Sequence, residues 1–363
     1  KPWKFTDDFF MTDAFNAHAL TFLKESVAGA KPFFLYVAYI APHWPLHARE
    51  ETIMPYRERY RKQGWNDWRS TRIERQQKMG LLPGDAKPAP YPANIPDWAK
   101  DKYKDWQAER MAVYAAQISN VDRGVGRMVD VLKQSGQLDN TLILFLSDNG
   151  AAPNGGFAPS NAGFGFSPNS PNNTWRKDRV AIRPGSGPKL MPGPHDTFAG
   201  YGLAWALTSN TPLRNAKMSA YEGGIRTPLI AHWPNVIKKG NGLTRQPGHV
   251  IDLMATCLDL ADQKYPTKFQ NRRPIPMEGK SLAPILRGKQ RPGHETLAWK
   301  NASGRALMMG DWKIVRPRDK HPWELYDLSS DPGETANLAK QHPARVKDMA
   351  DRYETWRQRV GAR

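Results

Sequence analysis

One stretch decides the fold of this chain: Leu142–Gly150, which reads LILFLSDNG. An unbroken apolar run stops abruptly at an acid, an amide and a glycine. Strands buried on both faces read this way in α/β sheets, and ligands bind at the carboxyl ends of such strands. Asp148 and Asn149 offer the hard oxygen ligands that Ca²⁺ and Mg²⁺ prefer, and Gly150 lets the backbone turn closely. Asp-Asn-Gly is equally good chemistry for an ordinary turn.

Two other segments repeat this combination of apolar residues and polar groups. Residues 32–46 read PFFLYVAYIAPHWPL, an apolar run that ends at His43 between two prolines. Residues 210–234 read NTPLRNAKMSAYEGGIRTPLIAHWP, and they place Lys217 before a Gly-Gly turn and a short apolar strand. Taken singly, a lysine is most often a solvated surface charge and a histidine a structural residue.

Taken together, these segments resemble the sulfatases, the formylglycine-dependent branch of the alkaline phosphatase superfamily. The resemblance extends from residues 9–14 (FFMTDA) to residues 323–334 (WELYDLSSDPGE), and it includes bacterial arylsulfatases of the larger type. It implies hydrolysis of sulfate esters, by S–O bond cleavage in which a metal stabilises the sulfate. The substrate is then a small-molecule or carbohydrate sulfate ester.

The resemblance also implies roles for four residues. His43 would contact the sulfate ester, and Lys217 would bind sulfate. Asp148 and Asn149 would bind a divalent cation, Ca²⁺ in preference to Mg²⁺. An imidazole can donate to a sulfate oxygen or protonate the leaving group near neutral pH, and a compact ammonium suits a sulfate oxygen.

The nucleophile of the family is missing. Sulfatases carry it in a Cys-x-Pro-x-Arg or Ser-x-Pro-x-Arg motif, which does not occur in these 363 residues. The single cysteine, Cys257, lies in a helical apolar pattern that predicts a buried position. The family's acidic metal-binding pair is absent too. Because the sequence opens on Lys1 and joins the family pattern past its start, we expect a C-terminal portion, inactive alone, whose formylglycine lies in the missing N-terminal part.

The order of elements predicts an α/β fold of the alkaline-phosphatase type, with a mostly parallel central sheet covered by helices on both faces. Helical spacing predicts helices through Ala14–Leu23 and Met111–Leu132, each leading to a strand. The two strands are expected at Phe33–Ile40 and Thr141–Ser147. Both steps fit a doubly covered sheet.

The pattern changes after a helix predicted at Val250–Ala261, because short strand-like runs separated by turns follow. A small antiparallel sheet is expected with strands at Thr296–Trp299, Arg305–Met309, Trp312–Arg316 and Trp323–Tyr326, followed by a helix at Ala344–Val360. We therefore divide the chain into a catalytic domain, 1–290, and a C-terminal subdomain, 291–363. The catalytic domain includes an insertion, 48–105, and an active-site loop, 151–210.

Several polar residues near these motifs are weaker candidates for the functional site. His195, Asp196 and Trp205 fit either substrate contact or ordinary loop and core packing. Arg214, Glu222 and Arg226 are expected to fix the loop that carries Lys217. We assign no catalytic role to any of the six.

The formal charge of +18 favours polyanionic partners, through the long-range field and counterion release. No nucleic-acid module accompanies the basic residues, so we expect no nucleic-acid partner. No apolar run reaches membrane-spanning length. Family resemblance suggests a periplasmic or secreted protein, and the oligomeric state stays open.

Two other functions remain open. One is a phosphodiesterase or phosphonate monoester hydrolase of the same superfamily, although an Asp-Asn pair favours a single hard cation over transition metals. The other is a non-catalytic binder of sulfated polyanions, consistent with the charge and the absent nucleophile.

Overall fold

The architecture comes from a computed structural model that describes residues 8–29, 31–154, 181–183, 186–238, 242–301 and 304–362. The helices are α1 (Met11–Ala28), α2 (Glu50–Lys62), α3 (Trp65–Lys78), α4 (Lys104–Gln134), α5 (Gly202–Asn210), α6 (Glu222–Ile225), α7 (Asp252–Leu260), α8 (Ala283–Leu286) and α9 (Pro343–Arg359), with 3₁₀ turns η1 (Trp98–Lys100) and η2 (Leu138–Asn140). The strands are β1 (Ile143–Leu146), β2 (Leu229–His232), β3 (Leu297–Lys300), β4 (Arg305–Met309), β5 (Trp312–Arg316) and β6 (Glu324–Asp327).

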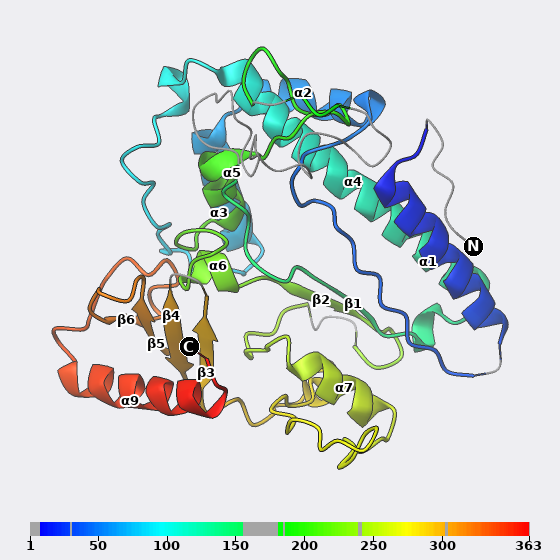
Figure 1. Cartoon of the computed structure of the whole chain (residues 1–363), viewed down its shortest axis with the longest axis vertical. Helices are drawn as coiled ribbons and strands as arrows, with labels where there is room; N and C mark the ends of the chain where they lie inside the picture. Colours follow the sequence, from blue (N-terminus) through cyan, green and yellow to red (C-terminus); the bar gives the residue numbers. More distant parts are fainter. Residues whose placement is uncertain are drawn as a thin grey trace.

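The long helix α4 organises the first half of the chain. It packs against both α1 and α2, and Figure 1 shows α1 running beside it. The two helices approach closely at Gly124, where a Cβ atom would lie 1.9 Å from the Asn16 side-chain oxygen. Asn16 also donates to the backbone carbonyl of Asn120, at 3.2 Å. The helix predicted at Met111–Leu132 is therefore confirmed as part of a longer helix.

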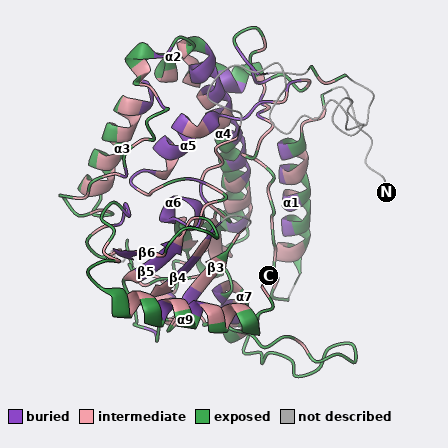
Figure 2. Cartoon of the chain, turned by 60° about the vertical axis from the view of Figure 1, so that its left-hand side comes forward, coloured by how far each residue is buried: buried purple, intermediate pink, exposed green. Residues whose placement is uncertain are grey.

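An aromatic core fixes α5, which Figure 2 shows almost wholly buried among its neighbours. Trp205 of α5 is fully buried and packs edge-on against Trp65 and Trp98, with ring centroids 5.7 Å and 5.8 Å away. Its indole N–H donates to the Gln107 carbonyl at 2.8 Å, which satisfies its polar atom inside the core. Both Trp65 and Trp98 come from the insertion at 48–105, so this insertion builds core as well as surface.

The strands β1 and β2 form a two-stranded antiparallel sheet in which Ile143 pairs with His232 and Leu146 with Leu229. The expected strand at Thr141–Ser147 is confirmed in position. The expected parallel pairing is absent from the described strands, each of which pairs antiparallel. Phe145 and Ile230 are 47% and 60% exposed, so one face of this sheet is open to solvent.

The strand predicted at Phe33–Ile40 was wrong as a hydrogen-bonded element. Residues 32–40 carry no strand assignment, although their exposure alternates along the chain with the period of two that an extended backbone gives. Phe34 and Tyr36 point outward at 78% and 79% exposure, while the Tyr39 hydroxyl donates to Asn16 at 2.6 Å. The segment therefore lies extended against α1 without pairing to a described strand.

The C-terminal antiparallel sheet is confirmed, with strand order β3-β4-β5-β6 and helix α9 packed against β4 and β5. Leu307, Ile314 and Leu325 face the helix and are fully buried against Met349 and Tyr353. The opposite face of the sheet packs on residues 220–221 of the loop that follows Lys217. The sheet is thus in direct contact with one of the predicted site segments.

Candidate functional site

The turn after β1 carries Asp148 and Asn149 and is fixed by the segment around α6. The Gly150 N–H donates to the Gly224 carbonyl at 3.1 Å, and the Thr227 hydroxyl donates to the Ser147 carbonyl at 2.8 Å. Only glycine fits at position 150, because a Cβ there would lie 1.8 Å from the Gly223 carbonyl oxygen. The sequence thus places the acid and the amide on a turn held by its neighbours.

The donor chemistry of this turn fits a hard divalent cation. Asp148 is exposed, and within the described residues its carboxylate makes no hydrogen bond or ion pair that would compete with a metal. Ca²⁺ takes six to eight oxygen ligands, so Asp148 and Asn149 would supply only part of its shell. No group of three or more His, Cys, Asp or Glu that could hold a metal occurs in the described part of the chain.

The loop carrying Lys217 lies directly beside this turn. The Lys217 N–H donates to the Ala151 carbonyl at 2.9 Å, three residues beyond Asp148 in the sequence. Asn215 and Met218 flank the lysine with φ of 68° and 75°, a left-handed conformation that is uncommon outside glycine. A loop with two such residues needs outside support to keep its shape.

Part of that support comes from a buried ion cluster on the C-terminal sheet. The Lys313 ammonium of β5 lies 2.7 Å from Glu222 and 2.9 Å from Glu334, and all three side chains are buried. The second carboxylate oxygen of Glu334 accepts the backbone N–H of Glu222 at 2.7 Å. This cluster clamps the start of α6, and therefore the Gly223–Gly224 backbone, to the sheet.

A second set of contacts supports the same loop. Arg214 donates to the Tyr326 hydroxyl at 2.8 Å and to the Glu334 carbonyl at 3.0 Å, and its guanidinium stacks over the Tyr221 ring. The Tyr221 hydroxyl donates to Glu324 at 2.6 Å. Arg226 lies 3.5 Å from Glu222. These contacts agree with the expectation that Arg214, Glu222 and Arg226 fix the loop.

The two buried carboxyl groups differ in pKa. Burial raises the pKa of Glu334 to about 7, although Lys313 opposes the shift. Burial also disfavours the charged Glu222, but Lys313 and Arg226 outweigh it and hold the pKa of Glu222 below its ordinary value. Because one lysine is shared by two acids, Glu222 keeps the charge and Glu334 takes up the proton first.

We expect a pH-dependent stability that Glu334 controls. Its pKa is higher in the folded chain than the ordinary 4.5, so folding binds a proton between these values. Stability is then greatest below pH 4.5 for this group and falls as pH rises through 7, by up to about 3 kcal/mol. Urea unfolding of Glu334→Gln between pH 5.5 and 8 should lack this fall. The prediction would be contradicted if the free energy of unfolding changed equally with pH in Glu334→Gln, the wild type and the exposed control Glu295→Gln.

His43 lies on a different loop. Its Nδ1 atom is 2.6 Å from the Trp44 carbonyl, which can only accept, so Nδ1 carries the hydrogen. The remaining Nε2 atom donates only when the ring is protonated. Residues 46–48 pair with Gly193 and Ala199 through backbone hydrogen bonds. Among the described residues, no hydrogen bond or ring contact joins His43 to the Asp148 turn or to Lys217, so its role stays a prediction.

The weaker candidates have ordinary structural positions. Asp196 forms a bidentate ion pair with Arg183, at 2.6 Å and 2.7 Å, and this contact lowers the pKa of Asp196. Trp205 is a core residue. Cys257 is half-buried on α7, less deeply than its apolar spacing predicts, and carries a free thiol. Much of the expected loop at 151–210 falls outside the described residues, namely 155–180 and 184–185.

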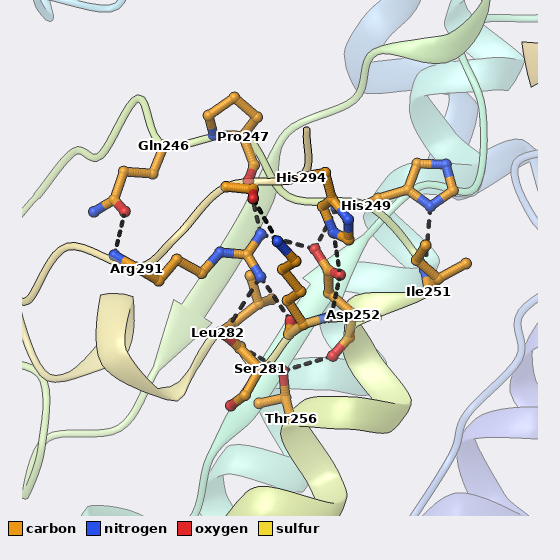
Figure 3. Close-up of polar contacts among 12 residues, drawn as sticks. Gln246, Pro247, His249, Ile251, Asp252, Thr256, Ser281, Leu282, Arg291 and His294 are labelled. Atoms are coloured by element: carbon orange, nitrogen blue, oxygen red, sulfur yellow. Dashed lines mark hydrogen bonds and ion pairs between the residues drawn. The ribbon is translucent and has the colours of Figure 1, made fainter. Parts of the chain in front are cut away.

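Figure 3 shows a second buried polar cluster, around Asp252 at the start of α7. The carboxylate accepts from Arg291 at 2.8 Å, from His294 at 2.7 Å and from two backbone N–H groups. Burial raises the pKa of Asp252, but these donors outweigh it and lower the net value. Since both oxygens are engaged, Asp252 joins α7 to residues 280–294 and offers no free metal ligand.

With this geometry established, comparison with known proteins defines the family. The sulfatase family model matches residues 2–263, and the model of the C-terminal region of N-sulphoglucosamine sulphohydrolase matches residues 215–358. The chain belongs to the sulfatase family. In general terms, the family works with a metal ion and a formylglycine residue.

Among curated proteins, an uncharacterised sulfatase of Schizosaccharomyces pombe is 34% identical over 92% of this chain and 59% of its own length. An arylsulfatase of Klebsiella aerogenes is 31% identical over 78% of this chain and 58% of its own length. The chain therefore spans somewhat more than half the length of these two relatives.

Solved structures show the same fold. A crystal structure of Ps i-CgsB in complex with k-i-k-neocarrahexaose covers 97% of this chain and 56% of its own, with a TM-score of 0.60 and 24% identity. The phosphonate monoester hydrolase SpPMH from Silicibacter pomeroyi covers 98% and 60%, with a TM-score of 0.51 and 20% identity. At these identities the likeness establishes the α/β fold of the alkaline-phosphatase type and nothing about substrate.

Three residues that shape the site were not predicted from the sequence. Asn210 joins the Asp148 turn to the Lys217 loop, and Lys313 and Glu334 clamp α6. Asn210 offered a weak signal, an amide that follows a short apolar run and stands two residues before a proline. Lys313 offered none, because a lysine in a short alternating strand reads as solvent-exposed.

Proposed function

We propose that this chain supplies the cation-binding and sulfate-binding part of an enzyme that hydrolyses sulfate esters. The observation that carries the proposal is the hydrogen bond from Lys217 to Ala151, which holds the lysine loop against the turn of Asp148 and Asn149. A hard cation and an ammonium group carried on adjoining segments would suit the negatively charged sulfuryl oxygens of a sulfate ester. Membership of the sulfatase family supports the same reading.

Each residue has a definite task in this proposal. Asp148 and Asn149 hold a divalent cation, Ca²⁺ in preference to Mg²⁺ because the oxygen donors sit on a turn rather than in a rigid octahedral cage. Such a cation polarises the sulfuryl oxygens when bound. Lys217 donates to a sulfate oxygen, and protonated His43 donates to the ester or its leaving group. The chain contains no formylglycine motif, so it binds and orients the ester without attacking it.

Two alternatives make different predictions. A phosphonate monoester hydrolase shares the fold, as SpPMH shows, but the Asp-Asn pair favours a single hard cation. A simple polyanion binder is compatible with the charge of +18. It would bind sulfated glycans in a salt-dependent way and need no metal.

The remaining assignments follow from this function. We propose a catalytic domain over residues 1–290 and a C-terminal subdomain over 291–363 that supports the Lys217 loop. The substrate is a small-molecule or carbohydrate sulfate ester. None of the described helices is long and apolar enough to cross a membrane. We propose a periplasmic or secreted location from family resemblance.

Calorimetric titration of inorganic sulfate into the chain with saturating Ca²⁺ tests the proposal. We expect Lys217→Ala to weaken sulfate binding by roughly 10- to 100-fold, since a hydrogen bond to a charged group contributes about 1.5–3 kcal/mol. Lys264→Ala, at an exposed lysine after α7, is the matched control and should bind like wild type.

Two results would count against this function. Equal sulfate affinity in the Lys217 and Lys264 variants would show that binding follows overall charge. Turnover of 4-nitrophenyl sulfate by this chain, lost in Asp148→Ala, would show that its residues include the nucleophile after all.

A further inference from the structure

We propose that Asn210 is a positioning residue that couples the cation-binding turn to the sulfate-binding loop. The inference deepens the proposed function and rests on it. Asn210 is the last residue of α5, and its side-chain amide contacts three separate backbone segments. Two of these carry the residues assigned to the cation and to sulfate.

Both polar atoms of the Asn210 side-chain amide form hydrogen bonds. Its Oδ1 atom accepts the Ala151 N–H at 2.9 Å, just after the Asp148 turn. Its Nδ2 atom donates to the Asn215 carbonyl at 2.9 Å, two residues before Lys217, and to the Gly223 carbonyl at 2.7 Å. One acceptor and two donors are thus used in three directions, which a carboxylate or a hydroxyl cannot reproduce.

The three segments also touch each other where Asn210 joins them. A Cβ at Gly223 would lie 2.2 Å from the Asn215 carbonyl oxygen, and one at Gly150 would lie 1.8 Å from the Gly223 carbonyl oxygen. Backbones this close have little freedom to slide independently. The amide therefore sets the spacing between the turn and the loop, while α5 holds the amide through the buried Trp205.

If Asn210 sets the spacing, cation binding at Asp148 and sulfate binding at Lys217 favour the same local conformation, and each ligand raises the affinity of the other. Loss of the amide should weaken this mutual effect more than it weakens either ligand alone. A residue needed only for stability would not act in that way.

The test compares Asn210→Asp with Asn66→Asp. Aspartate at 210 keeps an acceptor for the Ala151 N–H but replaces the donating Nδ2 by an oxygen that faces the Asn215 and Gly223 carbonyls. Asn66 is the matched control, because its amide also bridges segments, to Trp98 and Asp97, away from the site. Amide hydrogen exchange should become at least 10-fold faster at Gly150 and Lys217 in Asn210→Asp, and stay unchanged there in the control.

The second readout is the Ca²⁺ dissociation constant with and without saturating inorganic sulfate. We expect sulfate to lower it at least 5-fold in wild type and in Asn66→Asp, and less than 2-fold in Asn210→Asp. Unchanged exchange at Gly150 and Lys217, or wild-type coupling in Asn210→Asp, would overturn the inference. If the wild type binds neither Ca²⁺ nor sulfate, the proposed function fails, and the exchange data still decide whether Asn210 joins the two segments.

Discussion

Lys313→Met should lower the free energy of unfolding by about 3–5 kcal/mol, because it leaves a buried ion cluster without its lysine. The side chains of Lys313 and Glu334 are fully buried, and that of Glu222 is 6% exposed. Methionine fills a similar volume but neutralises neither carboxylate. Arg226 lies 3.5 Å from Glu222 and is half exposed, so it replaces little of the lost interaction. Urea unfolding at pH 7.5 measures the loss.

Two further variants separate the buried charge from general damage. Lys347→Met removes an exposed lysine that pairs with Asp351 on α9, and it should leave stability essentially unchanged. Lys313→Met combined with Glu222→Gln and Glu334→Gln removes both unpaired charges, and it should recover most of the loss. A stable Lys313→Met single variant would show that the cluster does not clamp α6 to the sheet.

Asp148→Ala should reduce Ca²⁺ affinity by roughly 100-fold or more. Even residues that only support a metal ligand contribute about 10- to 100-fold to metal affinity, and we propose Asp148 as a ligand itself. The carboxylate makes no competing contact among the described residues, so its loss should leave the fold intact. Isothermal titration with CaCl₂ measures the affinity, and thermal unfolding checks the fold.

Asp130→Ala on α4 is the matched control, since it removes one exposed carboxylate away from the turn. It should bind Ca²⁺ like wild type. A similar loss in both variants would show that Ca²⁺ responds to total charge, as expected of a polyanion binder without a metal site.

The C-terminal sheet was predictable from the sequence because its signals are local. Strands β4 and β5 begin and end where the pattern placed them, since Gly310, with φ of 58°, sets the turn between them. The strand expected at Phe33–Ile40 failed for the opposite reason. A strand needs a neighbour for its backbone hydrogen bonds, and an apolar run does not say where that neighbour is.

The functional site likewise has some residues that the sequence predicted and others that it did not. The motifs drew attention to Asp148 and Lys217, and the backbone contact to Ala151 puts their segments side by side. Lys313 and Glu334 could not be found by spacing, because they meet Glu222 across 91 and 112 residues of sequence. Such a pair is specified by tertiary packing, which one sequence does not reveal.

We propose that Asp148, Asn149 and Lys217 form one site for a cation and a sulfate group. The most direct test is the Ca²⁺ dissociation constant of the wild-type chain, measured by calorimetry without sulfate and with saturating sulfate. We expect Ca²⁺ to bind in both conditions, with an affinity at least 5-fold higher when sulfate is present. An affinity that sulfate leaves unchanged, or no Ca²⁺ binding at all, would contradict this proposal.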